Sequence, residues 1–293
     1  MKILLTGGSG FIGRNIRESN LASKYEIIAP THAQLDLADD ASVDAFFHNN
    51  SFDAILHGAG KPGHRNALDP SNIFYTDIRM FLNLLKYRNQ LGRIIVLGSG
   101  AIYDQRWPIV KVKEEDYVLK VPVDEHALYR RVSAEMMEQI DNVVELRIFG
   151  IFGKYEDYAI RFISNAICKT LFDLPITIKQ NRTFDYLWAG DLAPVLDYFL
   201  QNPAEHKVYN LSSGRPVELL ELAKQVKAIS GKNLPIHIAE PGLGPEYTGD
   251  NSRLKKEISG LVFTPIKQAI QELYAWYEKN IGLLDREDLL KDK

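Results

Sequence analysis

The amino-acid sequence predicts an α/β fold, a doubly wound parallel sheet followed by a smaller C-terminal α/β lobe. Short apolar runs alternate with helical patterns, which is the rhythm of βαβ units. The first apolar run, residues 2–6, leads directly into a glycine-rich turn at residues 7–13. At 293 residues, the chain is long enough for one large domain and a second, smaller unit.

The first half of the chain supplies the predicted sheet. Apolar and β-branched runs predict strands, and patterns of period 3.6 predict the helices between them. The strands are expected at residues 2–6, 26–29, 54–58, 93–97 and 143–147. The helices are expected at residues 11–21, 41–49, 72–90 and 124–140. Residues 1–150 are therefore predicted to form the larger domain.

The second half has a looser rhythm and is predicted to form the smaller lobe, residues 151–293. Its elements from about residue 183 to 203 are expected to complete the larger domain. The predicted helices are 160–172, 191–201, 218–230 and 266–280, and the predicted strands are 176–178, 184–188 and 208–211. Proline and glycine predict a long loop at 235–249, and charge predicts a solvated tail at 285–293.

The composition limits the classes of partner. The formal net charge of −3 argues against nucleic acid or a membrane surface as the partner. No apolar run approaches the roughly 20 residues that span a bilayer, and no signal peptide precedes the first strand, so a cytoplasmic protein is expected. The single cysteine, Cys168, lies in an apolar helical pattern and is predicted to be buried. The histidines show no paired metal spacing, so no metal site is expected.

The glycine-rich turn predicts a dinucleotide cofactor. Gly7 permits a tight turn, Gly10 lets backbone N–H groups approach a pyrophosphate, and Gly13 lets the helix pack closely on the strand. A strand that comes first and a helix that follows are the context that this motif requires. The sequence therefore predicts a Rossmann-type domain.

Ligands of such sheets bind at the carboxyl ends of the strands. Small residues follow the third strand at 57–63, and Ser99 follows the fourth strand. Tyr129 begins the next helix. A serine hydroxyl and a phenol that meet at a nicotinamide could bond a carbonyl or alcohol and relay its proton. Ser99 and Tyr129 are therefore candidate catalytic residues.

These segments resemble those of extended short-chain dehydrogenase/reductases, the nucleotide-sugar epimerase and dehydratase family, nearest to GDP-fucose synthase-like members. The likeness covers nearly the whole chain and includes residues 6–13, 99–103, 182–193, 209–214 and 250–254. It implies a nucleoside-diphosphate sugar as substrate and a homodimer built on the helices at 72–90 and 124–140. It also implies cofactor contacts from Gly7, Gly10, Phe11, Ile12, Gly13, Arg14, His32, Asp36, Leu37, Gly58, Ala59, Gly60, Lys61 and Tyr129. The candidate substrate contacts are His64, Ala101, Arg147, Arg161, Arg182 and Arg253, the arginines because guanidinium groups suit phosphates.

The chain departs from this family pattern at a third candidate catalytic position, Ser133, where a lysine is usual four residues after the tyrosine. In the family that lysine holds the nicotinamide ribose and lowers the pKa of the tyrosine. Residues at +3 and +4 on a helix face position 0, so Arg130 and Arg131 are not expected to replace the lysine. Ala101 stands where GDP-fucose synthases carry a catalytic cysteine, which argues against their double epimerisation.

The second strand ends without the acidic residue that selects NAD. Because Arg14, Thr31 and His32 could bind a 2′-phosphate, NADP is favoured, and NAD stays open. The resemblance implies 4-keto reduction, or epimerisation through a ketone, in the synthesis of polysaccharide precursors. Two alternatives remain: a dinucleotide-binding protein with weakened catalysis, and a nucleotide-sugar dehydratase.

Overall fold

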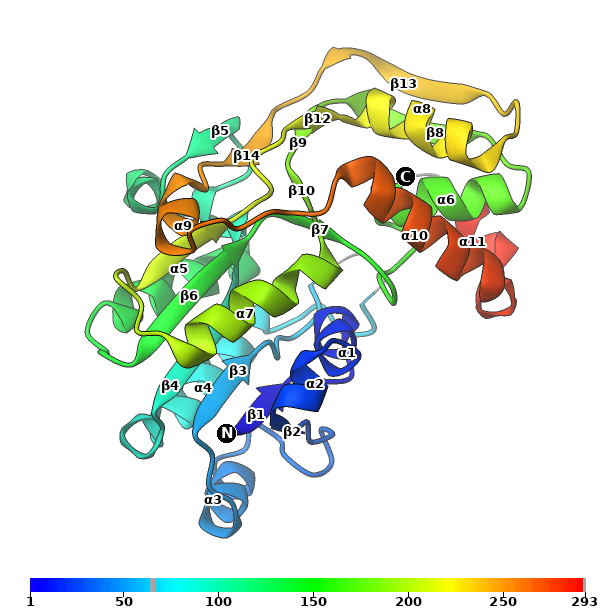
Figure 1. Cartoon of the computed structure of the whole chain (residues 1–293). Coiled ribbons are helices and arrows are strands. Elements are labelled where there is room, and N and C mark those ends of the chain that lie inside the picture. The colour runs from blue at the N-terminus through cyan, green and yellow to red at the C-terminus, as the bar shows by residue number, and fades with distance from the viewer. Residues whose placement is uncertain (64–66, 292–293) are drawn as a thin grey trace.

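The structure is a computed structural model that describes residues 1–63 and 67–291. Its centre is a six-stranded parallel sheet with the strand order β2-β1-β3-β4-β6-β11 (Figure 1). The strands are β1 (Lys2–Thr6), β2 (Glu26–Ile28), β3 (Ala54–His57), β4 (Arg93–Ser99), β6 (Val143–Ile148) and β11 (Val208–Leu211). The predicted fold class is confirmed, and all six predicted strands of this sheet are present.

Helices cover both faces of the sheet (Figure 1). One face carries α1 (Phe11–Arg17), α2 (Leu21–Lys24) and α7 (Leu192–Gln201), and the other carries α3 (Asp40–Asn49), α4 (Ile73–Leu85) and α5 (Glu125–Met137). Alternate residues of each strand point to opposite faces. Leu4 accordingly packs in one apolar cluster, whereas Ile3 and Leu5 pack in the other. Both faces are thus buried, which explains the nearly continuous apolar strands.

The C-terminal lobe, which lies to one side of the large sheet in Figure 1, has its own apolar core. It contains α6 (Phe162–Leu171), α8 (Leu219–Ser230), α10 (Ile266–Lys279) and the parallel pair β8 (Ile176–Asn181) and β13 (Ile236–Leu243). Cys168 is fully buried in this core, as predicted. The domain boundary at residue 150 stays a prediction.

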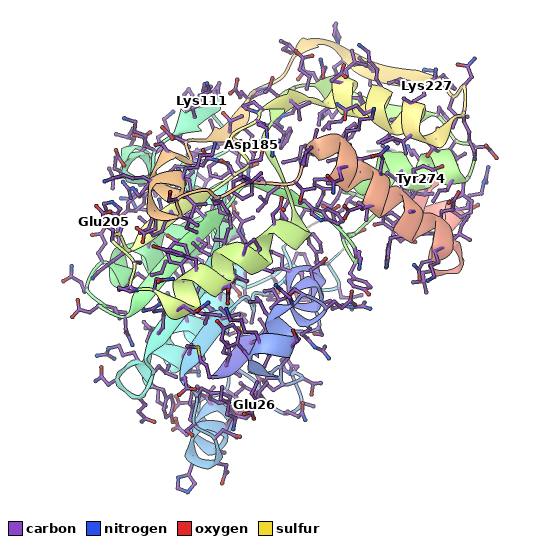
Figure 2. All side chains as sticks on the ribbon, viewed as in Figure 1. Glu26, Lys111, Asp185, Glu205, Lys227 and Tyr274 are labelled. Carbon is purple, nitrogen blue, oxygen red and sulfur yellow. The ribbon has the colours of Figure 1, made fainter. Side chains whose placement is uncertain are left out.

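Short strands link the lobe to the large sheet. β7 (Gly150–Phe152) pairs with β10 (Tyr186–Trp188), and a second small sheet joins β12 (Val217–Glu218), β9 (Thr183–Phe184), β14 (Tyr247–Gly249) and β5 (Ile109–Val112). Between β9 and β10 lies Asp185, labelled in Figure 2, which is fully buried. Its carboxylate accepts hydrogen bonds from the Ser213 N–H at 2.7 Å and the Gly214 N–H at 2.8 Å, in the loop after β11.

Two sequence-based expectations for the C-terminal half are wrong. Residues 235–249 are not a loop, because Ile236 and the next residues pair with β8 and form β13. The tail from residue 285 is not fully solvated, because α11 (Arg286–Leu290) packs Leu289 into the core of the lobe with 1% exposure. Both contacts join segments far apart in sequence. Within the described residues, no helix is long and apolar enough to cross a membrane.

Candidate active site

A cavity of about 560 Å³ opens at the carboxyl ends of β1, β2 and β3. The strand order reverses at β1, which lies between β2 and β3, and open α/β sheets bind ligands at such a reversal. Phe11, Ile12 and Gly13 begin α1 just beyond the cavity. Nine predicted cofactor residues line it, namely Gly7, Gly10, His32, Asp36, Leu37, Gly58, Ala59, Gly60 and Lys61.

Close backbone contacts require glycine at two positions of the turn after β1. Gly7 has a φ of +72°, and a Cβ there would lie 2.7 Å from the carbonyl carbon of Gly58. A Cβ at Gly13 would lie 2.6 Å from the Cα of Gly8. Only glycine fits such a conformation and such contacts. A turn this tight lets backbone N–H groups approach a pyrophosphate, so the cleft fits a dinucleotide.

The arginine near the end of β2 is Arg17, which the sequence analysis did not single out. Arg14, predicted as a cofactor contact, stacks on Tyr155, with its Cζ 3.5 Å from the ring centroid. Arg17 donates to the carbonyl of Gly8 at 3.4 Å. A Cβ at Gly8 would lie 3.6 Å from the Arg17 Cδ and 2.6 Å from the Cβ of Ala29, which follows β2. The spacing of Arg17 from Arg14, one turn along α1, is the signal that could have found it.

The loop after β2 offers groups for either nicotinamide dinucleotide. The Nε2 of His32 lies 3.7 Å from the Oδ1 of Asp36. That carboxylate also accepts a hydrogen bond from the Ala38 N–H at 2.9 Å. A carboxylate suits the ribose hydroxyls of NAD, whereas a basic residue such as Arg17 suits the 2′-phosphate of NADP.

The segment after β3 is tied to α4 by Asp77. This carboxyl group has 1% exposure, and its Oδ1 accepts a hydrogen bond from the Lys61 N–H at 2.7 Å. Its Oδ2 has no hydrogen-bond partner among the described residues. Burial raises the pKa of Asp77, although the Lys61 N–H and the Arg130 charge oppose the rise. The side chain of Lys61 pairs with Asp69 at 2.7 Å, so Lys61 contributes mainly backbone to the cleft.

Ser99 ends β4 and caps the short 3-10 helix that follows it. Its Oγ accepts a hydrogen bond from the N–H of Ala101, a predicted substrate contact, at 3.1 Å. A Cβ at Gly100 would lie 2.6 Å from the hydroxyl of Tyr247, so this helix packs directly on that phenol. Burial raises the pKa of Tyr247, and hydrogen bonding with Ser99 opposes the rise. A second phenol therefore lies beside the predicted catalytic serine.

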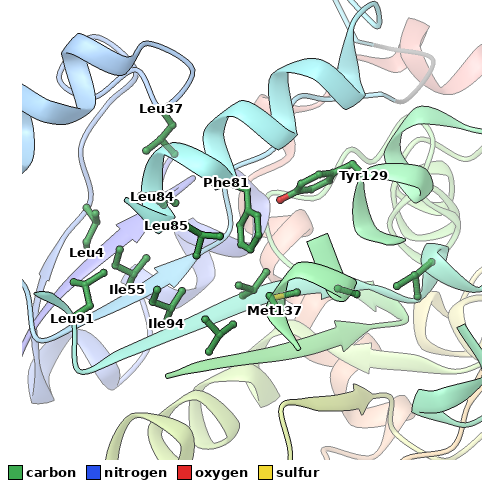
Figure 3. Close-up of a cluster of buried hydrophobic side chains, with 14 of the residues drawn as sticks. Leu4, Leu37, Ile55, Phe81, Leu84, Leu85, Leu91, Ile94, Tyr129 and Met137 are labelled. Atoms are coloured by element: carbon green, nitrogen blue, oxygen red, sulfur yellow. The ribbon is translucent and has the colours of Figure 1, made fainter. Parts of the chain in front are cut away.

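Tyr129 is buried between α5 and α4. It has 1% exposure, and its ring packs edge-on against Phe81 with the centroids 6.5 Å apart. Figure 3 shows its hydroxyl directed toward Phe81. Burial raises the pKa of Tyr129 to about 12, against the lowering effect of the Arg130 charge. The phenol is therefore protonated at neutral pH.

Arg130, which the helical spacing had not placed facing Tyr129, lies close to its ring. The Cζ of Arg130 lies 5.1 Å from the centroid of the Tyr129 ring, and its Nη1 donates to the Leu97 carbonyl at 3.2 Å. Ser133 is buried, and its hydroxyl donates to the carbonyl of Arg130 at 3.2 Å. Helical spacing fixes the direction of a Cβ, but a long arginine side chain can still place its guanidinium over a neighbouring ring.

Two of the predicted substrate arginines, Arg161 and Arg182, lower the pKa values of the same two tyrosines. Arg182 follows β8, and its Cζ lies 4.5 Å from the ring centroid of Phe184. Its buried Nε has no hydrogen-bond partner in the described part of the chain. Arg161, which precedes α6, is exposed. Burial raises the pKa values of Tyr186 and Tyr247, and the charges of both arginines oppose the rise.

The other two predicted arginines have partners within the protein. Arg147 has 1% exposure, its Nε pairs with Glu145 at 2.8 Å, and its Nη1 donates to the Glu114 carbonyl at 2.7 Å. Arg253 pairs with Glu115 at 3.0 Å. Arg147 was expected to contact a substrate phosphate, but β6 is an inner strand covered on both faces, so its guanidinium is enclosed in the core.

A histidine that the sequence analysis did not single out lies one turn before Tyr129. His126 is on α5, and burial lowers its pKa to about 4, with Arg130 and Arg161 acting in the same direction. The i, i+3 spacing from Tyr129 is the signal that could have found it. His64, predicted to face the cleft, lies outside the described residues.

Comparison with known proteins identifies the family. The chain matches the NAD dependent epimerase/dehydratase family over residues 3–212. It is 25% identical over 256 residues to GDP-L-colitose synthase of Yersinia pseudotuberculosis, across 79% of this chain and 82% of that protein. It is 24% identical to UDP-glucose 4-epimerase of Bacillus subtilis (strain 168), across 96% of this chain and 98% of that protein.

Solved structures show the same fold. GDP-mannoheptose C4 reductase from Campylobacter jejuni with NADP bound superposes with a TM-score of 0.79, over 94% of this chain and 98% of that one, at 19% identity. UDP-glucose 4-epimerase from Thermotoga maritima with UDP-glucose gives a TM-score of 0.79, over 96% of this chain and 100% of that one, at 17% identity. The match at residues 3–212 includes the glycine turn, Ser99 and Tyr129. This chain therefore belongs to the NAD dependent epimerase/dehydratase family.

Proposed function

We propose that this chain is an NADP-dependent oxidoreductase that reduces a keto group of a nucleoside-diphosphate sugar. The observation that carries the proposal is the buried phenol of Tyr129 on α5, a helix whose next residue, Arg130, lies near Gly60 in the wall of the dinucleotide cleft. The similarity to a GDP-mannoheptose C4 reductase supports a reductase, and the similarity to GDP-L-colitose synthase supports a nucleotide sugar as substrate.

The cleft residues would hold the dinucleotide. The turn at Gly7 and Gly10 would accept the pyrophosphate, and Gly58 with Ala59 would let the rest of the cofactor lie close to the backbone. Arg17 and His32, near the end of β2, favour a 2′-phosphate and hence NADP. A bound reduced nicotinamide would supply the hydride.

Ser99 and Tyr129 would handle the substrate oxygen. The Tyr129 phenol donates its proton to the carbonyl oxygen of the ketone as the alcohol forms. The Ser99 hydroxyl hydrogen-bonds the same oxygen. Reduction needs the phenol protonated, whereas oxidation of an alcohol needs the phenolate. A pKa of about 12 for Tyr129 therefore favours reduction near neutral pH.

Arg182 and Arg161 would bind the diphosphate of the substrate. The unpartnered Nε of Arg182 is a donor that an anion could satisfy. Both arginines lie near Tyr186 and Tyr247, and Tyr247 in turn contacts Ser99. The nucleotide would thus lie in the C-terminal lobe, with its sugar directed toward the catalytic serine.

A thermal-shift panel of UDP, GDP, CDP and dTDP, measured with cofactor-loaded protein, tests the substrate class. We expect one nucleotide to raise the melting temperature and Arg182→Ala to weaken its binding roughly 10- to 100-fold, because a charge-assisted hydrogen bond contributes about 1.5–3 kcal/mol. Arg286→Ala, on the exposed helix α11, is the matched control. The substrate assignment fails if no nucleotide raises the melting temperature or if Arg182→Ala binds it normally.

The loss of NADPH absorbance with a 4-keto nucleotide sugar then tests the reaction itself. The expected turnover should fall by on the order of 10²-fold in Tyr129→Phe. Nucleotide and cofactor binding without any turnover would instead indicate a binding protein, and product formation without loss of NADPH would indicate epimerisation or dehydration.

A further inference from the structure

Arg130 is a buried cation with few partners. Its exposure is 8%, and its Nη1 hydrogen-bonds the carbonyl of Leu97 near the end of β4. Its Nε has no hydrogen-bond partner among residues 1–63 and 67–291. Burial of an incompletely solvated charge is unfavourable unless neighbouring groups compensate for it. Burial of this guanidinium therefore has a free-energy cost that a role at this position would explain.

The guanidinium lies between the dinucleotide cleft and the phenol of Tyr129. On one side, a Cβ placed on Gly60, in the wall of the cleft, would lie 4.0 Å from the Arg130 Nη2 and 3.8 Å from the Asp77 Oδ2. On the other side, the Cζ of Arg130 is 5.1 Å from the centroid of the Tyr129 ring. Its Leu97 contact fixes it two residues before Ser99.

The other groups around Tyr129 disfavour its phenolate. Phe81 of α4 presents an aromatic ring, and the carboxylates of Asp77 on α4 and Glu145 on β6 raise the pKa of the phenol further. The Ser133 hydroxyl on α5 lowers it only by hydrogen bonding. The positive charge of Arg130 opposes the effects of burial and of both carboxylates on the pKa of Tyr129. The same charge also lowers the pKa of His57, which burial lowers most.

We propose that Arg130 is a positioning residue for Tyr129, and that its buried guanidinium supplies the positive charge beside the phenol that Ser133 cannot supply. The charge comes from the residue next to the tyrosine in sequence, whose guanidinium lies over the tyrosine ring. This inference rests on the proposed role of Tyr129 as the proton donor.

The test replaces Tyr129 by a difluorotyrosine, whose phenol is more acidic than tyrosine and little larger. Its ionisation is followed by fluorine NMR in the NADP-loaded protein, so the readout needs no substrate. A nearby opposite charge lowers the pKa of an ionisable group by about 1–3 units, and Arg130 acts in this direction on Tyr129, so Arg130→Gln should raise the pKa of the labelled phenol by at least about one unit. Arg131→Gln is the matched control, because Arg131 pairs with Glu135 and packs on the ring of Tyr117, and it should leave the titration unchanged.

Two further variants separate charge from packing. Arg130→Lys, which keeps a cation with a similar stem, should stay within a few tenths of a unit of the parent protein. Arg130→Gln combined with Ser133→Lys should recover the lower pKa. The proposal is overturned if Arg130→Gln titrates like the parent, or if neither lysine variant differs from Arg130→Gln. If Arg130→Gln does not fold, Arg130→Met is compared with Arg130→Lys. The phenol of Arg130→Met should then have the higher pKa, and equal pKa values in these two variants would overturn the proposal.

The same variants are followed in the pH profile of ketone reduction. The limb that reports loss of the phenol proton should move to higher pH in Arg130→Gln by the shift seen in the NMR titration. If the protein has no reductase activity, this profile is flat, but the NMR titration still measures the effect of Arg130 on the pKa of the labelled phenol. Failure of the proposed function and failure of this inference are therefore distinguishable.

Discussion

Replacement of Arg147 by leucine should destabilise the fold strongly, because its guanidinium is part of a buried network. It pairs with Glu145 at 2.8 Å and donates to the Tyr103 hydroxyl at 3.1 Å and the Glu114 carbonyl at 2.7 Å. The side chains of Arg147 and Glu145 are each 2% exposed. Leucine would leave the Glu145 carboxylate buried without its counter-charge, and the other Glu145 oxygen already lacks a partner among the described residues.

Removal of one partner from a buried ion pair costs about 3–5 kcal/mol. For a protein of this size, each kcal/mol lowers the melting temperature by about 2–4 °C, so Arg147→Leu should melt about 6–20 °C below the parent. Circular dichroism during heating and in denaturant measures both quantities. Arg147→Leu combined with Glu145→Leu should recover much of the loss, because two apolar side chains can replace a buried pair.

Arg286→Leu is the control, since its exposed pair with Glu287 is worth at most about 1 kcal/mol. The reasoning is refuted if Arg147→Leu keeps the parental melting temperature. If that variant also lost nucleotide binding, Arg147 would be a substrate ligand, as the sequence first suggested.

Three further predictions follow from single features. Arg17→Ala should weaken NADPH binding about tenfold or more and change NADH binding little, whereas Arg14→Ala should leave the binding of both unchanged. Calorimetry measures both affinities, and equal effects of Arg17→Ala on NADPH and NADH would contradict this prediction. Burial lowers the pKa of His57 from 6.5 to about 3, so its contribution to stability is complete above pH 6.5 and is lost as pH falls toward 3. At pH 5 the loss in free energy of unfolding is about 2 kcal/mol relative to pH 8. In denaturant titrations, the stability of His57→Gln should therefore depend less on pH than that of the exposed-site control His48→Gln. Parallel pH curves for the two variants would show that His57 is not the source of this dependence. Because Tyr75 on α4 is 60% exposed, we expect α4 and α5 to pair between two chains, and light scattering at micromolar concentration should give twice the chain mass of 33.3 kDa; a single-chain mass would refute the dimer.

Local sequence was sufficient for the fold class and for the cofactor turn. The strands of the large sheet are short apolar runs that need burial on both faces, and this requirement is visible in their composition. Gly7 and Gly13 are likewise demanded by the backbone itself, because a Cβ at either position would collide with neighbouring backbone. The order of strand, glycine turn and helix therefore predicted the cleft and most of the residues that line it.

The tertiary structure decided which side chains lie at the site and which lie in the core. β13 exists because it pairs with β8, and α11 is ordered because Leu289 finds an apolar pocket in a distant part of the chain. Arg147 has the chemistry of a phosphate ligand, but its guanidinium forms an ion pair with Glu145 on the same inner strand. Arg130 reaches Tyr129 through the torsions of a long side chain. Sequence spacing fixes where each Cβ points, but long polar side chains follow the charges and surfaces that folding brings next to them.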